Sequence, residues 1–342
     1  MIGDAVAQLP DELLLDGAWF RVEAAANAAA VRRAAERLAI HLAMPEKRIA
    51  DLSIVTAEAA GNLVKHADQG VLLVRTVRTA QQAGVEIVAI DRGPGLADLP
   101  RAIGDGHSTA GTLGIGLGAI VRQSSWSDLH SVPGKGTVLV AQVWPADPPP
   151  PARAAGLTRP LAGEAVSGDA FAVRDAAGRL QVLMCDGLGH GGLAAAAAQE
   201  AVHAFAAAAS VGPAQLVEVL HAKLNHTRGA ALAVAELDPE AGLVRYAGLG
   251  NIAGTVLGAG TRRGMVSLPG IAGHQRRQIR QFDYPIDAES IVLMHSDGVV
   301  DRWQPADYPG LLSRSPAVIA ATVLRDAGIR RDDAGVVVAK LP

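Results

Sequence analysis

The chain has 342 residues, of which 49% are hydrophobic and 3% aromatic. This length predicts two domains of roughly 150 residues each, and the hydrophobic content excludes wholesale disorder. The 31 basic and 34 acidic residues give a net charge of −3, which argues against a partner such as nucleic acid or an anionic membrane. The single cysteine, Cys185, excludes an intramolecular disulfide and a Cys-based zinc cluster. We find no secretion signal and no apolar run of the roughly 18 residues that a membrane span needs, so we expect a cytoplasmic protein.

The first half begins with helical patterns and continues with strand-like ones. Apolar residues repeat at helical spacing from Val31 to Leu42. Pro45 and Glu46 mark the start of a second helix that we expect to reach about His66. The later elements expected in this half are strands at 71–77 and 85–90, a helix near 117–123 and a strand at 137–144.

A proline-rich stretch from Pro145 to Pro151 separates the two halves. Consecutive prolines lack N–H donors and favour an extended polyproline conformation. We therefore expect a first domain at 1–145, a linker at 146–160 and a second domain at 161–342; the alternative is a proline-rich loop within one domain.

The second half alternates short strands with alanine-rich helices. The helices are expected at 193–209 and 213–224, and the strands at 181–184, 231–237, 243–246, 290–294 and 336–340.

Two polar residues of the first half lie on one helix face. Glu58 and Asn62 are four residues apart, so their side chains project from the same side. A carboxylate and an amide oxygen there could act as a base and a metal ligand. The pair alone is more typical of a solvated polar stripe than of a site.

Three glycine-containing motifs follow in the first half. Asp91 ends a strand and precedes Gly93 and Gly95, which allow a ligand to approach the backbone closely. A glycine-rich segment leads into a helix, where free N–H groups favour a phosphate. Its glycines include Gly114, Gly116 and Gly118, and a further motif contains Gly136 and Thr137.

In their order and spacing, these four elements resemble the four boxes of the GHKL ATPase superfamily, and the segment Asp105–Gly118 is similar to RsbT-type serine/threonine kinases. The resemblance implies an α/β sandwich of the Bergerat type that binds ATP and Mg²⁺. By position, Asn62 would ligate Mg²⁺ and Glu58 would act as the base. Asp91 would bind the adenine amino group, Thr137 would complete the adenine pocket, and the glycines of 114–118 would wrap the phosphates.

Acidic residues flank the apolar strands of the second half. They are Asp169, Asp186, Asp297 and the pair Asp332 and Asp333. A single Asp-Gly is ordinarily a turn, but clustered carboxylates repel one another unless cations hold them. Oxygen ligands without a His–Cys set favour Mg²⁺ or Mn²⁺ over zinc.

This pattern resembles the metal-dependent type 2C protein phosphatases and, among them, the SpoIIE/RsbX branch. The resemblance implies an αββα sandwich in which two ions are bound by Asp169, Asp186, the Gly187 carbonyl, Asp297 and Asp333. A metal-activated water would then attack phosphoserine or phosphothreonine.

Two positions depart from this family's pattern, and one residue has an open role. Ala172 stands where many relatives carry a second Asp, and Ala334-Gly335 replaces a usual Thr, which we expect to loosen the last strand. His190 either caps the following helix, the interpretation we favour, or helps to hold phosphate.

The whole chain is therefore expected to be an α+β protein of two domains that regulates a partner-switching or stressosome-type pathway. Its phosphatase and ATP-dependent kinase domains would act on a STAS-domain antagonist. Alternatively, the first domain is not catalytic: it binds a sigma factor or an antagonist, or senses nucleotide, and controls the phosphatase.

Overall fold

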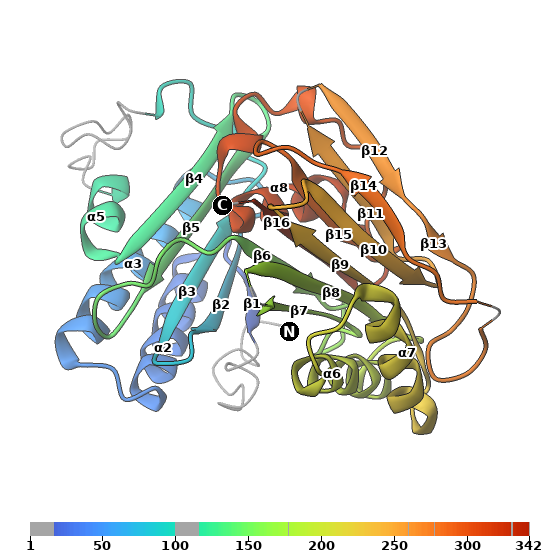
Figure 1. Cartoon of the computed structure of the whole chain (residues 1–342). Helices are drawn as coiled ribbons and strands as arrows, with labels where there is room; N and C mark the ends of the chain where they lie inside the picture. The colour runs from blue at the N-terminus through green and yellow to red at the C-terminus, as the bar shows by residue number, and fades with distance from the viewer. Residues whose placement is uncertain are drawn as a thin grey trace. The chain divides into compact units, whose positions relative to one another are not determined.

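The computed structural model describes residues 17–99, 116–176, 178–258, 260–276, 278–329 and 331–341. The chain forms two compact units (Figure 1). Unit 1 contains Met1–Pro151 and Pro305–Arg314, and unit 2 contains Ala152–Gln304 and Ser315–Pro342.

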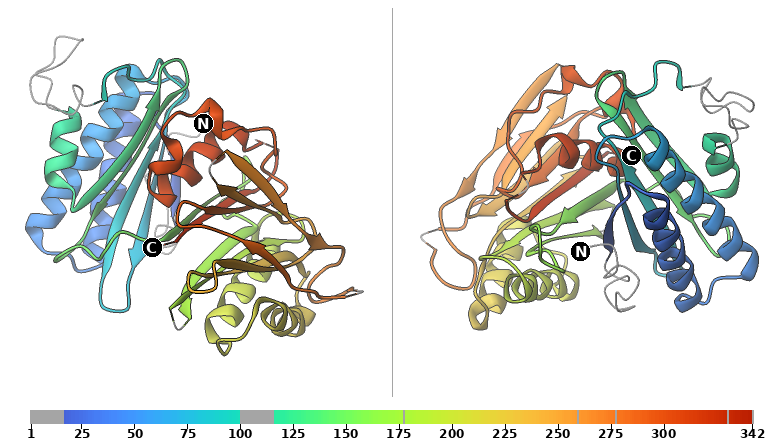
Figure 2. Two further views of the ribbon diagram at one scale, coloured as in Figure 1. Left: turned by 45° about the horizontal axis from the view of Figure 1, so that its top comes forward. Right: turned by 180° about the vertical axis from the view of Figure 1, so that it is seen from behind.

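Unit 1 is built on a five-stranded antiparallel sheet in the order β1-β2-β3-β5-β4. Its strands are β1 (Ala18–Arg21), β2 (Val71–Arg78), β3 (Ala83–Ile90), β4 (Trp126–Val132) and β5 (Gly136–Val143). The helices α2 (Ala25–His41), α3 (Glu46–His66) and α5 (Gly116–Gln123) lie on one face of this sheet (Figure 2). Unit 1 is thus an α/β sandwich, as its sequence predicts. The short 3-10 helices η3 (Pro305–Asp307) and η4 (Leu311–Ser313) belong to its second segment.

The helices of unit 1 are held by the apolar stripes that the sequence shows. Val31, Ala34 and Leu38 of α2 are buried, at the i, i+3/i+4 and i+7 spacing of one helix face. In α3, Leu52 and Val55 are buried in the same core. Because this apolar face of α3 is fixed against the sheet, the positions of its polar residues are fixed as well.

Unit 2 consists of two packed sheets with helices on their outer faces. The first sheet has the order β13-β10-β9-β8-β7, with β14 also paired to β10, and the second has the order β12-β11-β15-β16-β6. Their strands are β6 (Ala154–Arg159), β7 (Asp169–Ala176), β8 (Arg179–Gly187), β9 (Ala230–Asp238), β10 (Leu243–Leu249), β11 (Ala253–Gly258), β12 (Thr261–Met265), β13 (Ser267–Leu268), β14 (Phe282–Pro285), β15 (Ile291–His295) and β16 (Ala334–Lys340).

Helices cover the outer faces of these two sheets. The helices α6 (Gly192–Ala207) and α7 (Pro213–Lys223) pack on the first sheet, and α8 (Pro316–Ala327) packs on the second (Figure 2). The 3-10 helix η2 (Leu224–His226) follows α7. Unit 2 is therefore an αββα sandwich, as predicted.

Alternating side chains of β8 fill two different cores. Val182 and Met184 lie in the cluster between the sheets, whereas Leu183 and Cys185 lie in the cluster under α6 and α7. Because successive side chains of a strand point to opposite faces, Asp186 belongs to the series that faces the second sheet.

One predicted boundary differs from the structure. Residues 154–159, expected within the linker, form β6 and pair with β16 in antiparallel register. Because β16 is strongly apolar, it takes a neighbour on both edges, and β6 supplies the second one. The prolines from Pro145 to Pro151 precede this strand.

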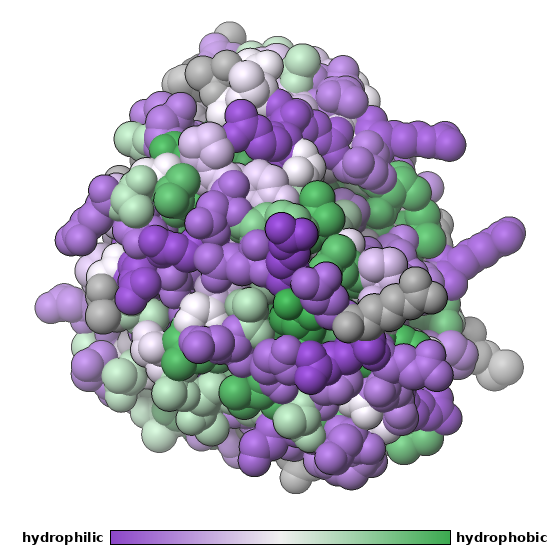
Figure 3. Space-filling view, turned by 45° about the vertical axis from the view of Figure 1, so that its right-hand side comes forward, coloured by the Kyte–Doolittle hydropathy of each residue, from purple (hydrophilic) through white to green (hydrophobic). Residues whose placement is uncertain are grey.

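Within the described part of the chain, no helix is both long and apolar enough to cross a membrane. Hydrophilic residues cover most of the face shown in Figure 3, and the hydrophobic residues on that face lie in separate groups among them.

Candidate functional site

In unit 2, strand pairing brings the first two predicted acidic residues together. Asp169 begins β7, and the antiparallel register places it directly opposite Asp186 on β8. Directly opposed residues share a face, with their Cβ atoms roughly 4.5–5.5 Å apart. Both carboxyl groups therefore lie at one end of the space between the two sheets.

The second sheet contributes Ser296 to the same place. Met294 of β15 faces the core between the sheets, and Ser296, two residues later, has the same orientation. The Ser296 hydroxyl donates a hydrogen bond of 2.6 Å to Oδ2 of Asp169 and accepts one of 3.0 Å from the Gly335 N–H. Ser296 thus ties the two sheets together through Asp169. The sequence alone did not indicate a role for this serine, which directly precedes Asp297.

Asp297 follows β15 and is held from two sides. Asn251 donates a hydrogen bond of 2.7 Å to its Oδ2. The side chains of Asp186 and Asp297 also share a hydrogen bond. The structure therefore brings Asp169, Asp186 and Asp297 into one group.

Asp333 directly precedes β16, and its carboxylate accepts hydrogen bonds from backbone N–H groups. Its Oδ1 accepts the Leu161 N–H at 2.7 Å and its Oδ2 accepts the Gly168 N–H at 3.0 Å. Gly168 in turn accepts the N–H of Gly187, the last residue of β8, at 3.0 Å. Asp333 and Gly187 thus border the acidic group and fix the segment that leads into β7.

The acidic group is electrostatically strained. Burial, followed by the charge of Asp186, raises the pKa of Asp169 well above its usual range, and the hydrogen bond from Ser296 only partly offsets this. Burial and then Asp297 raise the pKa of Asp186 to about 7. The pKa of Asp297 is also raised, by burial and then by Asp332. Three neighbouring carboxyls that resist ionisation form an environment suited to bound cations.

The donor set fits divalent cations. Oδ1 of Asp169 is buried and has no hydrogen-bond partner among the described residues. In the described part of the chain, no three His, Cys, Asp or Glu side chains already surround one point as metal ligands. Strand register nevertheless places Asp169 opposite Asp186, and the charges of Asp186 and Asp297 both raise the pKa of Asp169. Hard oxygen donors with excess negative charge are what Mg²⁺ and Mn²⁺ require.

Two expectations about neighbouring residues are wrong. The helix α6 is capped by Gly191 with no side-chain hydrogen bond, and Nδ1 of His190 instead lies 2.8 Å from Oε1 of Glu164. The Ala334-Gly335 pair does not loosen the last strand, because Gly335 pairs with Thr158 and exchanges hydrogen bonds with Ser296.

The lone cysteine of the second half is structural. Cys185 is fully buried, and burial raises the pKa of its thiol well above the ordinary value. A nucleophilic role, which requires the thiolate, is therefore disfavoured.

In unit 1, the predicted pair on α3 meets the start of another helix. A Cβ added to Gly116 would lie 3.2 Å from Oε2 of Glu58 and 3.3 Å from Oδ1 of Asn62. Glu58 and Asn62 therefore approach the first residue of α5 together, and a side chain at Gly116 would crowd both of them. Gly116 and Gly118 lie in the first turn of α5, which begins one residue before the expected helix. Gly114 lies outside the described residues.

The turn after β3 forms the second part of this site. Oδ1 of Asp91 accepts the Gly93 N–H at 2.7 Å, and the Asp91 N–H donates to the Thr137 carbonyl at 3.0 Å. The Thr137 hydroxyl lies 2.9 Å from that of Ser131, which also accepts the Leu96 N–H at 2.8 Å. The structure thus brings Asp91 and Thr137 together, and adds Ser131, which the sequence analysis missed.

The same turn is anchored to neighbouring elements. A Cβ at Gly93 would lie 2.6 Å from the carbonyl oxygen of His66, one helical turn beyond Asn62. Gly95 has a φ of +69°, and a side chain there would meet the Val132 carbonyl at the end of β4. The close approach at Gly116 and the amide oxygen of Asn62 fit a nucleotide phosphate with its magnesium.

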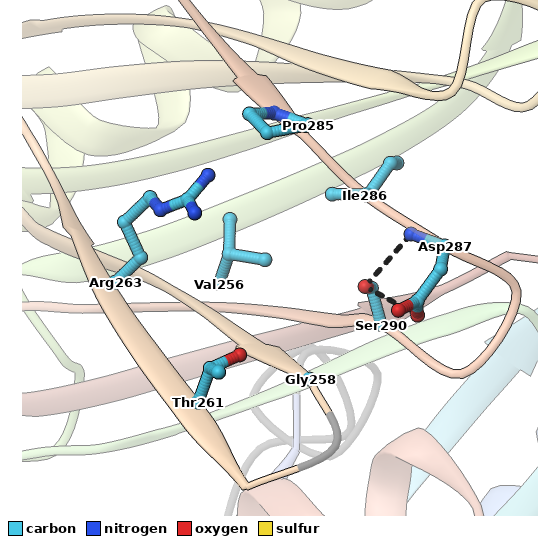
Figure 4. A pocket seen from close by; sticks show the side chains of 8 residues that line it. All are labelled: Val256, Gly258, Thr261, Arg263, Pro285, Ile286, Asp287 and Ser290. Carbon is cyan, nitrogen blue, oxygen red and sulfur yellow. Dashed lines mark hydrogen bonds between the residues drawn. The ribbon is translucent and has the colours of Figure 1, made fainter.

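A separate hollow of about 290 Å³ lies in unit 2 between β11, β12 and β14 (Figure 4). Its residues include Arg263 and Asp287, and the Asp287 N–H and carboxylate both bond the Ser290 hydroxyl. None of the predicted acidic ligands lines this hollow, so we do not assign it to the site.

Comparison with known proteins divides the chain in the same way. Residues 21–143 match the family model of the histidine kinase-like ATPase domain, and residues 176–342 match that of stage II sporulation protein E (SpoIIE). The serine/threonine-protein kinase RsbT of Bacillus subtilis (strain 168) is 35% identical over 95 residues, which are 28% of this chain and 71% of RsbT. The chain belongs to the RsbT family.

Two solved structures are also similar to this chain. One, from work on the bacterial stressosome as a modular system adapted to control secondary messenger signalling, is 30% identical with a TM-score of 0.50 and covers 55% of this chain and 98% of its own. The other, RsbX in complex with magnesium, is 18% identical with a TM-score of 0.47 and covers 55% of this chain and 94% of its own.

The chain thus joins an RsbT-like, histidine kinase-like ATPase domain to a SpoIIE-like domain. This is the composition of a partner-switching regulator.

Proposed function

We propose that unit 2 is a metal-dependent phosphatase that removes phosphate from serine or threonine of a small protein. The observation that carries this proposal is the group formed by Asp169, Asp186 and Asp297. Strand register places Asp169 directly opposite Asp186, and burial and neighbouring charge raise the pKa of all three carboxyls. Such carboxyls favour a site that binds cations.

Two Mg²⁺ or Mn²⁺ ions would be held by Asp169, Asp186, the Gly187 carbonyl, Asp297 and Asp333. When bound, such ions lower the pKa of water and neutralise charge on a phosphoryl group.

Other residues of this chain set the geometry of the ligands. Ser296 fixes one oxygen of Asp169 and leaves the other available, and Asn251 orients Asp297. The backbone N–H groups that Asp333 accepts restrict its rotation.

For unit 1 we propose a serine/threonine kinase that uses ATP and Mg²⁺. Its support is the convergence of Glu58 and Asn62 on the start of α5. Asn62 would hold Mg²⁺ and Glu58 would accept the proton of the substrate hydroxyl. Asp91 and Thr137, which are joined through the backbone, would bind the adenine, and Gly93 and Gly95 would shape the turn beside it.

The phosphate-binding glycines of this kinase would be Gly114, Gly116 and Gly118. We assign kinase activity to residues 1–145 and phosphatase activity to residues 161–342 together with β6.

We propose a STAS-domain antagonist as the common substrate, supported by the similarity to RsbT and to a structure from work on the stressosome. Under the competing hypothesis, unit 1 only binds a partner or senses nucleotide and controls the phosphatase. The presence of Glu58 beside Asn62 favours catalysis, since binding alone does not need a base. Transfer of labelled phosphate from ATP to one STAS protein decides between these hypotheses.

The phosphatase is tested with a phosphoserine-containing STAS protein as substrate. We expect phosphate release with Mn²⁺ or Mg²⁺, and its loss with a chelator or in the Asp186→Ala variant. The control is Asp175→Ala, which removes an exposed carboxylate from the far end of β7. Release that persists in a chelator, or in Asp186→Ala, would overturn the assignment.

A further inference from the structure

Strand register places an arginine beside the acidic group. In the pairing of β8 with β9, Gly187 stands opposite Ala230. The Leu188 N–H donates to the Gly229 carbonyl at 3.0 Å, so the antiparallel register continues beyond the strand ends. The next pair in this register is Gly189 and Arg228.

The guanidinium of Arg228 extends over Gly189. A Cβ at Gly189 would lie 3.3 Å from Nη1 of Arg228, and Gly189 has a φ of +92°, which disfavours a side chain there. Gly189 is three residues beyond Asp186, which is at most about 10 Å along an extended chain. The long side chain of Arg228 is thus held within reach of a group bound at the carboxyls.

Arg228 is exposed and makes no hydrogen bond or ion pair within the described part of the chain. Glu164, the acidic residue beside the same loop, is already paired with His190 at 2.8 Å. The positive charge of Arg228 therefore remains available to a ligand.

The backbone beneath Arg228 is well fixed. The Thr227 hydroxyl donates to the Leu224 carbonyl at 2.7 Å and accepts the Gly229 N–H at 3.0 Å. Nε2 of His274 lies 3.1 Å from the Thr227 carbonyl. A rigid turn that presents an unpaired side chain lowers the entropic cost of binding.

We infer that Arg228 binds the phosphoryl group of the substrate at the unit 2 site, next to the proposed cation ligands. This inference rests on the proposed phosphatase function. A guanidinium presents several N–H donors in a planar fork that matches phosphate oxygens, and such charge-assisted hydrogen bonds are stronger than neutral ones. Arg228 would supply positive charge to the phosphoryl oxygens that face away from the carboxyls.

The test uses the full chain loaded with Mn²⁺ and compares Arg228→Ala and Arg228→Lys with wild type. The matched control is Arg263→Ala, which removes an exposed arginine from β12. Three quantities are measured: KM and kcat for a phosphoserine protein and for para-nitrophenyl phosphate, the inhibition constant of inorganic phosphate, and the affinity for Mn²⁺.

We expect Arg228→Ala to raise both KM values and the phosphate inhibition constant in parallel, by about 10- to 100-fold. Arg228→Lys should recover part of this loss because it keeps the charge. The affinity for Mn²⁺ should remain within twofold of wild type in all variants, and Arg263→Ala should behave as wild type.

Three results would overturn the inference. The first is KM and inhibition by phosphate within twofold of wild type in Arg228→Ala. The second is a loss confined to the phosphoprotein, which would mean that Arg228 contacts the protein rather than its phosphate. The third is an equal fall in Mn²⁺ affinity, which would indicate a structural role.

A wrong phosphatase assignment would give a different experimental result from a wrong assignment of Arg228. If wild type hydrolyses neither substrate with Mn²⁺, the phosphatase assignment is wrong. Calorimetric titration of inorganic phosphate into the Mn²⁺-loaded protein then still decides the role of Arg228, because it needs no turnover. Equal phosphate affinity in wild type and Arg228→Ala would contradict the inference in that case.

Discussion

The two candidate sites are assembled in different ways. In unit 2, the ends of β7, β8, β15 and β16 supply carboxyls that are far apart in the sequence, and strand register decides which of them meet. In unit 1, Glu58 and Asn62 share a face of α3, and one approach by Gly116 completes the contact. In a site assembled by strand pairing, the position of each ligand depends on the others. On a helix face, in contrast, one side chain can be replaced without moving its neighbour.

The largest expected effect tests whether the base Glu58 and the magnesium ligand Asn62 act independently in unit 1. In Glu58→Gln, phosphotransfer from ATP should fall about 10²–10⁴-fold, because the proton of the acceptor loses its base. ATP affinity should stay within twofold, since Asn62 and the Asp91 turn are unchanged. Both are measured, the first with labelled ATP and the second by nucleotide titration.

The matched control is Glu46→Gln, which changes an exposed carboxylate in the first turn of the same helix. If the Glu58→Gln variant transferred phosphate at the wild-type rate, Glu58 would not be the base. A wild-type chain that binds ATP but transfers nothing would instead favour the hypothesis of a binding or sensing domain.

The second prediction tests the interdependence of the unit 2 site. Ser296→Ala removes the hydrogen bonds to Asp169 and Gly335, so phosphatase activity and Mn²⁺ affinity should both fall about 10- to 100-fold. Ser210→Ala, at an exposed serine, should change neither. If phosphatase activity and Mn²⁺ affinity were unchanged in Ser296→Ala, the two sheets would position their ligands independently.

The third prediction concerns pH. Because burial and then Asp297 raise the pKa of Asp186 to about 7, a proton competes with the cation. The apparent affinity for Mn²⁺ should rise about tenfold per pH unit below pH 7 and level off above it. Calorimetric titration between pH 5.5 and about 8.5 measures this, and a flat profile would mean that Asp186 is not a ligand.

The last prediction concerns the stability of unit 2. Folded Asp186 holds its proton up to about pH 7, against an ordinary value of 3.8, so the folded state binds more protons in that window. The free energy of unfolding of the cation-free protein should therefore fall as pH rises through it.

Asp186→Asn should accordingly raise the free energy of unfolding at high pH, by on the order of 1–4 kcal/mol at pH 8, while it abolishes phosphatase activity. The measurement is urea unfolding in a chelator, with Asp175→Asn as the exposed control. A destabilised Asp186→Asn would contradict the view that the acidic group is strained without cations.

The sequence predicted some elements well and missed others for identifiable reasons. The helices α2, α3, α6 and α7 were predicted because their apolar residues recur over three or more turns. The strands β1, β4 and β12 were missed because they are short or carry polar residues, and a partner strand supplies what their own pattern lacks. The helix α8 was missed because its apolar residues form a nearly continuous short run, which periodicity alone does not distinguish from a buried strand.

The same distinction holds for the candidate site residues. Asp169, Asp186, Asp297 and Asp333 could be named from the sequence because each adjoins an apolar strand. Ser296 and Ser131 could not, because a serine beside a strand is ordinary until its partner is known. The role of His190 was misjudged because a residue before a helix usually caps it, and Glu164, which it contacts instead, is 26 residues away in the sequence.

By itself, the sequence determined the class of each domain, the helix face that bears Glu58 and Asn62, and the acidic strand ends. These depend on periodicity and on residues near one another in the chain. The tertiary structure alone decided that Asp169 faces Asp186, that Ser296 joins the two sheets, and that Arg228 stands over Gly189. The physical reason is that register across strands is set by packing of whole sheets, and a shift of one residue would turn each of these side chains to the opposite face.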